Sequence, residues 1–189
     1  MKDTEATARQ HPFTPDELDA DRLAVYRSIT EGPRAKGPRL FDLVSDSGVL
    51  AGPFNEFLLR PALGDALQRL GAAIRYEGAL SGRSREMAIL VVAAAWDSEF
   101  ERTAHEAVGR AAGLTEEELA AIAAGAPLAL ADPHEAAVLR LTRALTAGDV
   151  DDETWSACVP PLDRETVFEL TTLVGYYATL ALQMRTFRV

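Results

Sequence analysis

Apolar side chains recur along this chain at intervals of three and four residues, which is the spacing of one face of an α-helix. In the segment 61–76, for example, Leu63, Leu67, Leu70 and Ile74 fall on a single helical stripe. Sustained alternation with a period of two, which would indicate strands, is not found in the sequence. Alanine and leucine, both strong helix formers, dominate the composition. The pattern predicts an all-α fold.

Helix boundaries are predicted by capping residues, prolines and glycines. Ser, Thr and Asp residues that can cap a helix precede several of the apolar segments, and Gly or Pro follows them. Thr14 is the expected cap of the first helix and Ser84 that of the helix before Trp96. We expect helices over roughly 15–31, 61–76, 85–96, 98–113, 133–146 and 163–185, shorter helices after Gly52-Pro53, after Thr115 and after Asp151 or Asp152, and an irregular or short helical segment over 41–50.

A Gly, Pro and Arg-rich stretch separates the first predicted helix from the rest of the chain. It runs from Gly32 to Pro38 and is typical of a linker. We therefore expect two parts, an N-terminal arm with one helix (1–38) and a main helical domain (39–189).

Composition and charge exclude several classes of protein. The net charge is −10, and the acidic excess lies after residue 40. Such a surface repels phosphate backbones, so we expect no nucleic-acid partner. The single cysteine, Cys158, excludes an intrachain disulfide framework. The longest apolar run, from Met87 to Trp96, is ten residues long, whereas a membrane span needs about twenty. With a polar N-terminus as well, the chain is expected in the cytoplasm, without a membrane partner.

The candidate chemistry lies in the segment 83–105. Glu101 and His105 are four residues apart and therefore share a helix face. Glu86 belongs to the first turn of the preceding helix and would approach His105 if the two helices pack. A carboxylate beside an imidazole forms a proton-transfer pair that works near neutral pH. The sequence contains no nucleotide-binding glycine motif and no histidine spacing typical of zinc, so we expect neither a metal nor an organic cofactor.

The same residues also have structural interpretations. Ser98 and Glu101 have the spacing of a capping box at the start of a helix. Glu86 could sit at a helix N-terminus and pair with Arg83 or Arg85. His105 could be a hydrogen-bonded core residue without a catalytic role. The residues alone leave these alternatives open.

The order of these segments resembles that of the carboxymuconolactone decarboxylase family, which includes the alkylhydroperoxidase-like proteins. The resemblance covers about 140 residues, from roughly residue 45 to the end of the chain. The segments that carry it are Gly48–Asn55, Arg85–Val92, Ala104-His105-Glu106, Ala112-Gly113-Leu114, Glu169-Leu170 and Leu173–Tyr177. It implies an alkylhydroperoxidase-like helical fold and a homo-oligomer, commonly a trimer or a hexamer.

The resemblance also narrows the chemistry. Peroxidase members of the family carry a CxxC pair, and this chain has Ser98 and Glu101 at those positions, with Glu86 and His105 at the family's glutamate and histidine positions. Neither serine nor glutamate can replace a redox-active cysteine. Cys158 lies far along the chain and is expected to fill space in the core. The sequence therefore predicts a member of the branch that lacks CxxC and is not a dithiol peroxidase.

The family's cysteine-free decarboxylases act on a carboxylated lactone without a cofactor. The resemblance thus implies a lyase or isomerase that transfers protons on a small anionic lactone or enolisable carbonyl compound. His105 would carry the proton, Glu86 would orient it, and Glu101 would be a second acid or base. The expected substrate-binding residues are Trp96, Ser98, Arg85 and Arg102. The alternatives are a family member recruited to a biosynthetic cyclisation, isomerisation or dehydration, and a non-catalytic helical binding protein.

Overall fold

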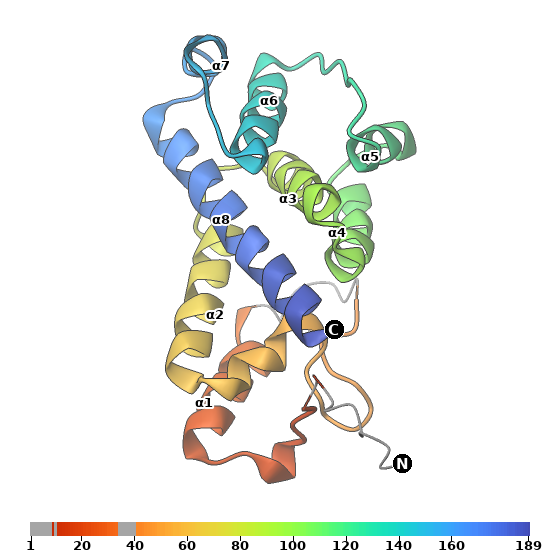
Figure 1. Cartoon of the computed structure of the whole chain (residues 1–189), viewed down its shortest axis with the longest axis vertical. Coiled ribbons are helices and arrows are strands. Elements are labelled where there is room, and N and C mark those ends of the chain that lie inside the picture. The colour runs from red at the N-terminus through yellow and green to blue at the C-terminus, as the bar shows by residue number, and fades with distance from the viewer. Residues whose placement is uncertain (1–8, 10, 34–40) are drawn as a thin grey trace, which may run out of the picture.

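One central helix, α3 (Gly82–Trp96), organises the part of the chain that the computed structural model describes, which is residue 9 and residues 11–33 and 41–189. Met87, Ile89 and Val92 of α3 have no exposed surface. A helix that is apolar on all sides is stable only when other elements cover it. The helices that contact α3 are α4 (Glu99–Ala111), α5 (Glu116–Ala123), α6 (Pro133–Ala147) and α8 (Arg164–Phe187), and α8 crosses the molecule diagonally in Figure 1.

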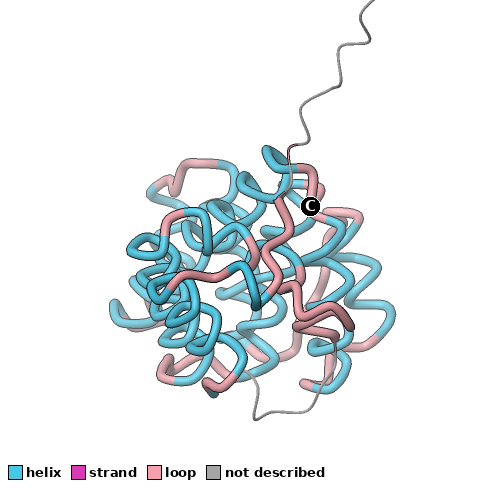
Figure 2. The backbone as a smooth tube through the Cα atoms, turned by 90° about the horizontal axis from the view of Figure 1, so that it is seen from below, coloured by secondary structure: helices cyan, strands magenta, loops and turns pink. Residues whose placement is uncertain are grey.

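The remaining elements cover the two ends of this core. They are η1 (Pro15–Glu17), α1 (Ala20–Thr30), η3 (Gly52–Phe54), η4 (Glu56–Leu59), α2 (Pro61–Tyr76) and α7 (Asp152–Cys158). Figure 2 shows that the described residues form helices and loops without strands. A single isolated bridge joins Val44 and Leu50 within the irregular segment 41–50. The predicted all-α fold is confirmed. None of the helices in the described ranges is long and apolar enough to cross a membrane.

Two predicted helix starts are wrong. Thr14 opens only the 3-10 turn η1, and α1 begins after Asp19, whose carboxylate accepts the N–H of Arg22 at 2.9 Å. Helix α3 begins at Gly82 instead of Arg85, because the Oγ of Ser81 caps it by accepting the N–H of Ser84 at 3.0 Å. In both cases a side chain nearby in the sequence is a suitable cap, and packing decides which one is used.

The apolar stripe predicted on α2 faces the core only in part: Ile74 is buried in the core and Leu67 packs against it, but Leu63 and Leu70 point outward. Leu63 is 67% exposed and Leu70 is 38% exposed, whereas Gly64, Gln68 and Gly71 are buried. A Cβ atom at Gly64 would lie 2.1 Å from the carbonyl oxygen of Phe57 in η4. The helix therefore approaches η4 on its small-residue side, and this close contact turns Leu63 and Leu70 outward.

The predicted boundary between arm and domain falls at residues 34–40, outside the described residues. Helix α1 packs on α2 and η4, and it contributes Val25 and Ile29 to the hydrophobic core. The first helix therefore shares the core of the rest, while the boundary after residue 38 stays a prediction.

Arg83 ties three helices together. Its Nε donates to both carboxylate oxygens of Glu135 on α6, at 2.9 and 3.1 Å, and its Nη1 donates to Glu118 of α5 at 3.0 Å. Glu118 also completes a capping box at the start of α5 by accepting the N–H of Thr115 at 2.8 Å. The hydrogen bond from Arg83 is the main cause that lowers the pKa of Glu118 to about 2. Arg83 therefore pairs with Glu118 and Glu135 and not with Glu86.

We expect Arg83→Met to lower the free energy of unfolding by about 2 kcal/mol, because it leaves two partly buried carboxylates without their shared cation. The contribution of the Arg83–Glu118 contact should be complete above the ordinary glutamate pKa of 4.5 and should be lost as the pH falls toward 2. Urea denaturation at several pH values measures both effects. The matched control is Arg69→Met, since the Arg69–Asp65 pair is exposed and should contribute less than about 0.5 kcal/mol. Equal losses in the two variants would contradict the role of Arg83.

Candidate active site

The candidate site lies where α3 and α4 pack against each other. Asp97 ends α3 in the left-handed conformation, with φ of 51°, and Ser98 begins the turn into α4. This short connection returns the chain along α3 and brings His105 of α4 to Glu86 of α3, with 2.6 Å between Nδ1 and Oε2. The sequence predicts that Glu86 approaches His105 if the two helices pack against each other. The structure shows that they do.

Glu86 is an ionised carboxylate without exposed surface. Its Oε1 lies 3.7 Å from Nη1 of Arg75 and 3.6 Å from Nε of Arg85. Burial alone would raise the pKa of Glu86, but the hydrogen bond with His105 and the charges of His105, Arg75 and Arg85 outweigh it, so that the pKa is lowered. A carboxylate on Nδ1 fixes the orientation of the imidazole and leaves Nε2 for a ligand.

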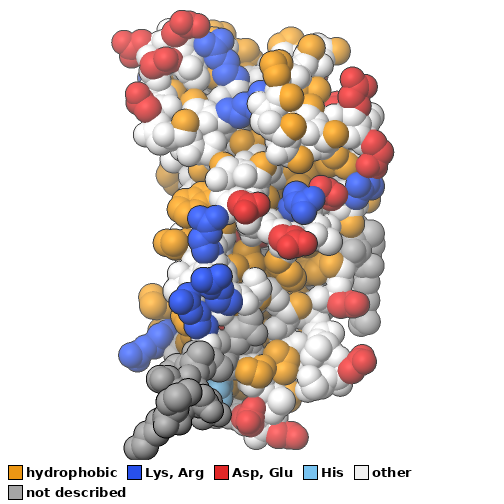
Figure 3. All heavy atoms as spheres, turned by 45° about the vertical axis from the view of Figure 1, so that its right-hand side comes forward, with side chains coloured by type: hydrophobic (Ala, Val, Ile, Leu, Met, Phe, Trp, Pro, Cys, Tyr) orange, Lys and Arg blue, Asp and Glu red, His pale blue; other side chains and the backbone are white. Residues whose placement is uncertain are grey.

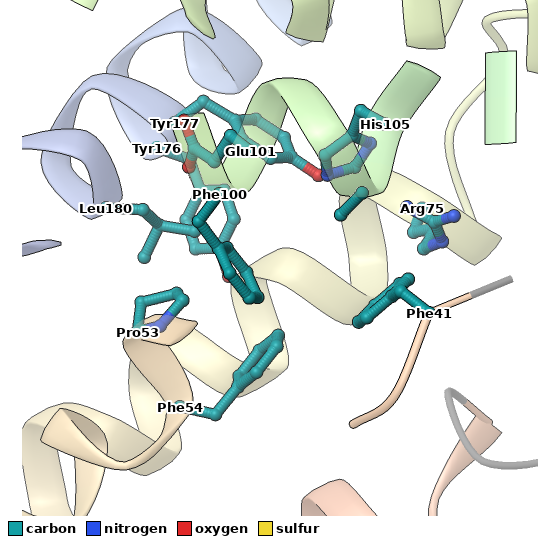
Figure 4. A pocket seen from close by; sticks show the side chains of 11 residues that line it. Phe41, Pro53, Phe54, Arg75, Phe100, Glu101, His105, Tyr176, Tyr177 and Leu180 are labelled. Carbon is teal, nitrogen blue, oxygen red and sulfur yellow. The ribbon is translucent and has the colours of Figure 1, made fainter. Parts of the chain in front are cut away.

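A small cavity adjoins His105 on the side of α8. Its volume is about 30 Å³, which is room for one or two water molecules. Figure 4 shows His105 and Arg75 on one side of this cavity, Tyr176, Tyr177 and Leu180 on another, and the rings of Phe54 and Phe100 nearby. The lining residues are Phe41, Pro53, Phe54, Arg75, Phe100, Glu101, Ala104, His105, Tyr176, Tyr177 and Leu180.

The carboxyl group that lines the cavity is that of Glu101, and its protonation state is opposite to that of Glu86. It is 2% exposed, and neither carboxyl oxygen has a hydrogen-bond partner of good geometry. Burial raises the pKa of Glu101 to about 8, while the Ser98 hydroxyl nearby offsets only part of this effect. At pH 7 the group is therefore mostly a neutral acid that can donate a proton.

The capping-box interpretation of Glu101 is not what the structure shows. The N–H of Ser98 donates to the carbonyl of Ala93 at 2.9 Å, so it is not available to Glu101. The side chain of Ser98 makes no capping hydrogen bond either. Glu101 is therefore buried in the cavity and does not cap the helix, although the Ser98 hydroxyl at the helix terminus lies near its carboxyl group.

The other candidate residues lie outside the cavity. Trp96 and Ser98 border an open cleft of about 320 Å³ between the start of α4 and the end of α8. Arg85 lies behind Glu86, and its Nε is buried. Arg102 is exposed on α4 and pairs with Glu106 at 3.8 Å, away from both the cavity and the cleft.

Sequence reasoning missed Arg75 and Phe100, although both line the cavity. An arginine in the last turn of a helix is usually explained by the negative end of the helix dipole, so Arg75 carries no distinctive local signal. The one sequence signal nearby is Ile74, an apolar residue of the predicted stripe. In the structure it is 5% exposed, so this end of α2 enters the core. Tyr177, whose ring lies 5.3 Å from that of His105, was noted only as part of the family resemblance.

Two arginines face one ionised glutamate in this buried cluster, since Glu101 is mostly neutral. The cluster therefore carries an excess of positive charge.

Cys158 lies on α7, buried, with Sγ 3.6 Å from the carbonyl oxygen of Ala137, so it fills space in the core as expected. Within the described ranges, no three His, Cys, Asp or Glu side chains gather in a group that could hold a metal ion.

We expect Glu101→Gln to change how stability depends on pH. The pKa of Glu101 is raised from 4.5 to about 8 on folding, so the native protein should lose stability as the pH rises from about 4.5 to 8, where the buried acid must ionise. The glutamine variant should lack this loss and become the more stable of the two at pH 8. Urea denaturation between pH 4 and 9 measures the difference, with the exposed neighbour variant Glu99→Gln as the control. Parallel curves for wild type and Glu101→Gln would contradict the raised pKa.

Comparison with known proteins finds one family model that matches part of the chain. Residues 61–144, from the start of α2 into α6, match the model of the carboxymuconolactone decarboxylase family. No curated protein matches the chain. The matched segment contains Arg75, Glu86, Glu101 and His105. Residues 61–144 are therefore similar to the carboxymuconolactone decarboxylase family, the described residues have the all-helical fold expected from an alkylhydroperoxidase-like protein, and the chain lacks the CxxC pair.

Proposed function

We propose that this protein is a cofactor-independent enzyme that transfers protons on a small anionic lactone or enolisable carbonyl compound, with decarboxylation as its reaction. One observation carries the proposal: a neutral acid, Glu101, and an imidazole supported by a carboxylate, His105, line the same cavity beside Arg75. Such a pair supplies both a proton donor and a proton acceptor near neutral pH.

The proposed roles follow from the contacts of each group. Arg75 holds the substrate carboxylate through charge-assisted hydrogen bonds. As the bond to CO₂ breaks, its electron pair moves into the conjugated carbonyl, and the neutral carboxyl of Glu101 donates a hydrogen bond to the oxygen that becomes negative. His105 then delivers a proton from Nε2 to carbon, while the Glu86 carboxylate stabilises the imidazolium. Solvent replaces the proton, so one proton is consumed for each CO₂ released.

Recruitment of the same groups to a biosynthetic isomerisation, cyclisation or dehydration needs the same proton transfers and is the second enzymatic candidate. A helical binding protein without catalysis is the third. The 30 Å³ volume of the cavity favours this last candidate, whereas the unpartnered acid of Glu101 within it favours chemistry. A cytoplasmic location stays a prediction.

We expect His105→Ala to lower turnover of γ-carboxymuconolactone by about 10²- to 10⁴-fold, the usual contribution of a positioned proton carrier. Release of CO₂ and incorporation of deuterium from D₂O at the protonated carbon measure the reaction. Arg75→Gln should mainly raise KM, because it removes the cation that holds the substrate. His134→Ala, which changes a histidine outside the cavity, is the matched control.

Full turnover by a folded His105→Ala variant would contradict the role of His105. A wild-type protein that neither releases CO₂ nor exchanges deuterium into the lactone or into simple 3-oxo acids would contradict the enzymatic proposal and support the binding protein. Circular dichroism of each variant checks that the helices are retained.

We also propose that the protein forms a homo-oligomer, as a trimer or a hexamer. The support is the large apolar side chains that α2 and α8 expose: Leu63, Phe168 and Leu182 are 67%, 73% and 52% exposed. Figure 3 shows apolar surface between charged side chains on one face of the molecule. Contiguous exposed apolar surface is typical of a protein interface.

We expect sedimentation velocity to give a particle of several times the 20.4 kDa chain mass. The double variant Leu63→Glu/Leu70→Glu should dissociate it, because buried charges disfavour an apolar interface. A double variant at the exposed positions Glu116 and Glu117, each changed to Gln, serves as the control. A monomer at all concentrations of the wild type would contradict the proposal.

A further inference from the structure

We propose that the substrate is an organic carboxylate that occupies two spaces at once, with its apolar body in the open cleft between α4 and α8 and its carboxylate in the cavity beside Arg75, and that the ring of Phe100 controls passage between them. This inference rests on the proposed function for what happens inside the cavity. It adds where the substrate enters, which residues select its body, and which side chain must move.

The volumes of the two spaces lead to this arrangement. The cavity of about 30 Å³ contains the candidate chemical groups but cannot hold an organic molecule. The cleft of about 320 Å³ reaches the size that small-molecule sites usually have, about 300 to 1,000 Å³, but Glu101 and His105 do not line it. A substrate that fills the cleft and reaches the cavity satisfies both observations.

Phe100 separates the two spaces. Among the described residues it is the one that lines both the cavity and the cleft, and its side chain is half-buried. It precedes Glu101 in the first turn of α4, so a change of rotamer would move the ring without moving the helix. Opening at this point would expose Glu101 and His105 directly to the cleft.

The closed position of the ring depends on Gly52. A Cβ atom at Gly52 would lie 2.2 Å from Cε1 of Phe100, so the ring occupies space that any other residue would fill. Phe41 makes an edge contact with the same ring, at 6.5 Å between centroids. These contacts are apolar, and rotation of the ring therefore breaks no hydrogen bond.

The residues that line the cleft and the cavity indicate the chemical class of the ligand. Trp96 and the buried Met184 offer the cleft an aromatic and a thioether surface, which suits an apolar or aromatic body. The charges of the cleft are mixed, because Arg185, Arg188, Asp97 and Glu99 all line it. Selection for an anion therefore comes from the cavity, which Arg75 lines, while Arg85 lies outside it beside the ionised Glu86.

The first measurement is the rate at which diethyl pyrocarbonate modifies His105, followed by peptide mass spectrometry. Phe100→Ala should raise this rate about tenfold or more, because the ring no longer closes the cavity, while His134 in the same sample should react unchanged. Phe168→Ala, which shortens an exposed aromatic side chain on α8, should behave as the wild type. If Phe100→Ala does not fold, Phe100→Leu is expected to give a smaller increase. A folded variant with the wild-type rate would overturn the role of Phe100.

The second measurement is calorimetric binding of 2-naphthoate and of its uncharged analogue 2-naphthamide. We expect Trp96→Ala to weaken binding of both compounds about tenfold, the effect of losing one aromatic contact of about 1.4 kcal/mol. Arg75→Gln should remove the preference for the acid over the amide. Arg164→Gln, on the opposite end of α8 from the cleft, is the matched control. Naphthoate binding that neither Trp96 nor Arg75 affects would overturn the two-space arrangement.

The two sets of experiments separate this inference from the proposed function. If naphthoate binds as expected but no variant affects any turnover, the binding site stands and the enzymatic proposal fails. If His105-dependent turnover is found but neither Phe100→Ala nor Trp96→Ala changes access or binding, the enzymatic proposal stands and this inference fails.

Discussion

The burial of the Glu86 carboxylate is the constraint on which the rest of the site depends. A fully buried negative charge is costly unless other charges and hydrogen-bond donors compensate it. Here the compensation comes from three elements: His105 of α4, Arg75 of α2 and Arg85 of α3 itself. The relative positions of these helices are therefore tied to one carboxylate. The same contacts leave one face of the imidazole ring at the cavity.

Two glutamates near one another show how environment sets the function of a side chain. Glu86 and Glu101 are both almost fully buried, at 0% and 2% exposure. Cations and a hydrogen bond surround Glu86 and lower its pKa, whereas burial raises the pKa of Glu101 to about 8. A pair of acids whose pKa values are driven apart is a common arrangement for acid and base roles in one site.

Much of the fold and part of the site could be predicted from the sequence. The limits of α2 and the all-helical class follow from local periodicity and capping, which depend on neighbouring residues. The proximity of Glu86 and His105 follows from one short turn between two helices. The exposed face of α2, the place of Arg75 and the neutral state of Glu101 could not be predicted, because contacts between segments far apart in sequence decide them, such as Gly64 against Phe57 or Glu101 beneath α8.

The turn at Asp97 has a consequence for how this site can diversify. Glu86 and His105 are only 19 residues apart, so the loop entropy needed to join them is small, and a single helical hairpin carries the pair. Outside this hairpin, the cavity wall comes from Phe41, η3, α2 and α8, which are separate in the sequence. Substitutions in those elements can therefore alter the shape of the ligand site without disturbing the pair. The α3–α4 hairpin therefore carries Glu86 and His105 by itself, and the surrounding elements determine which ligands reach them.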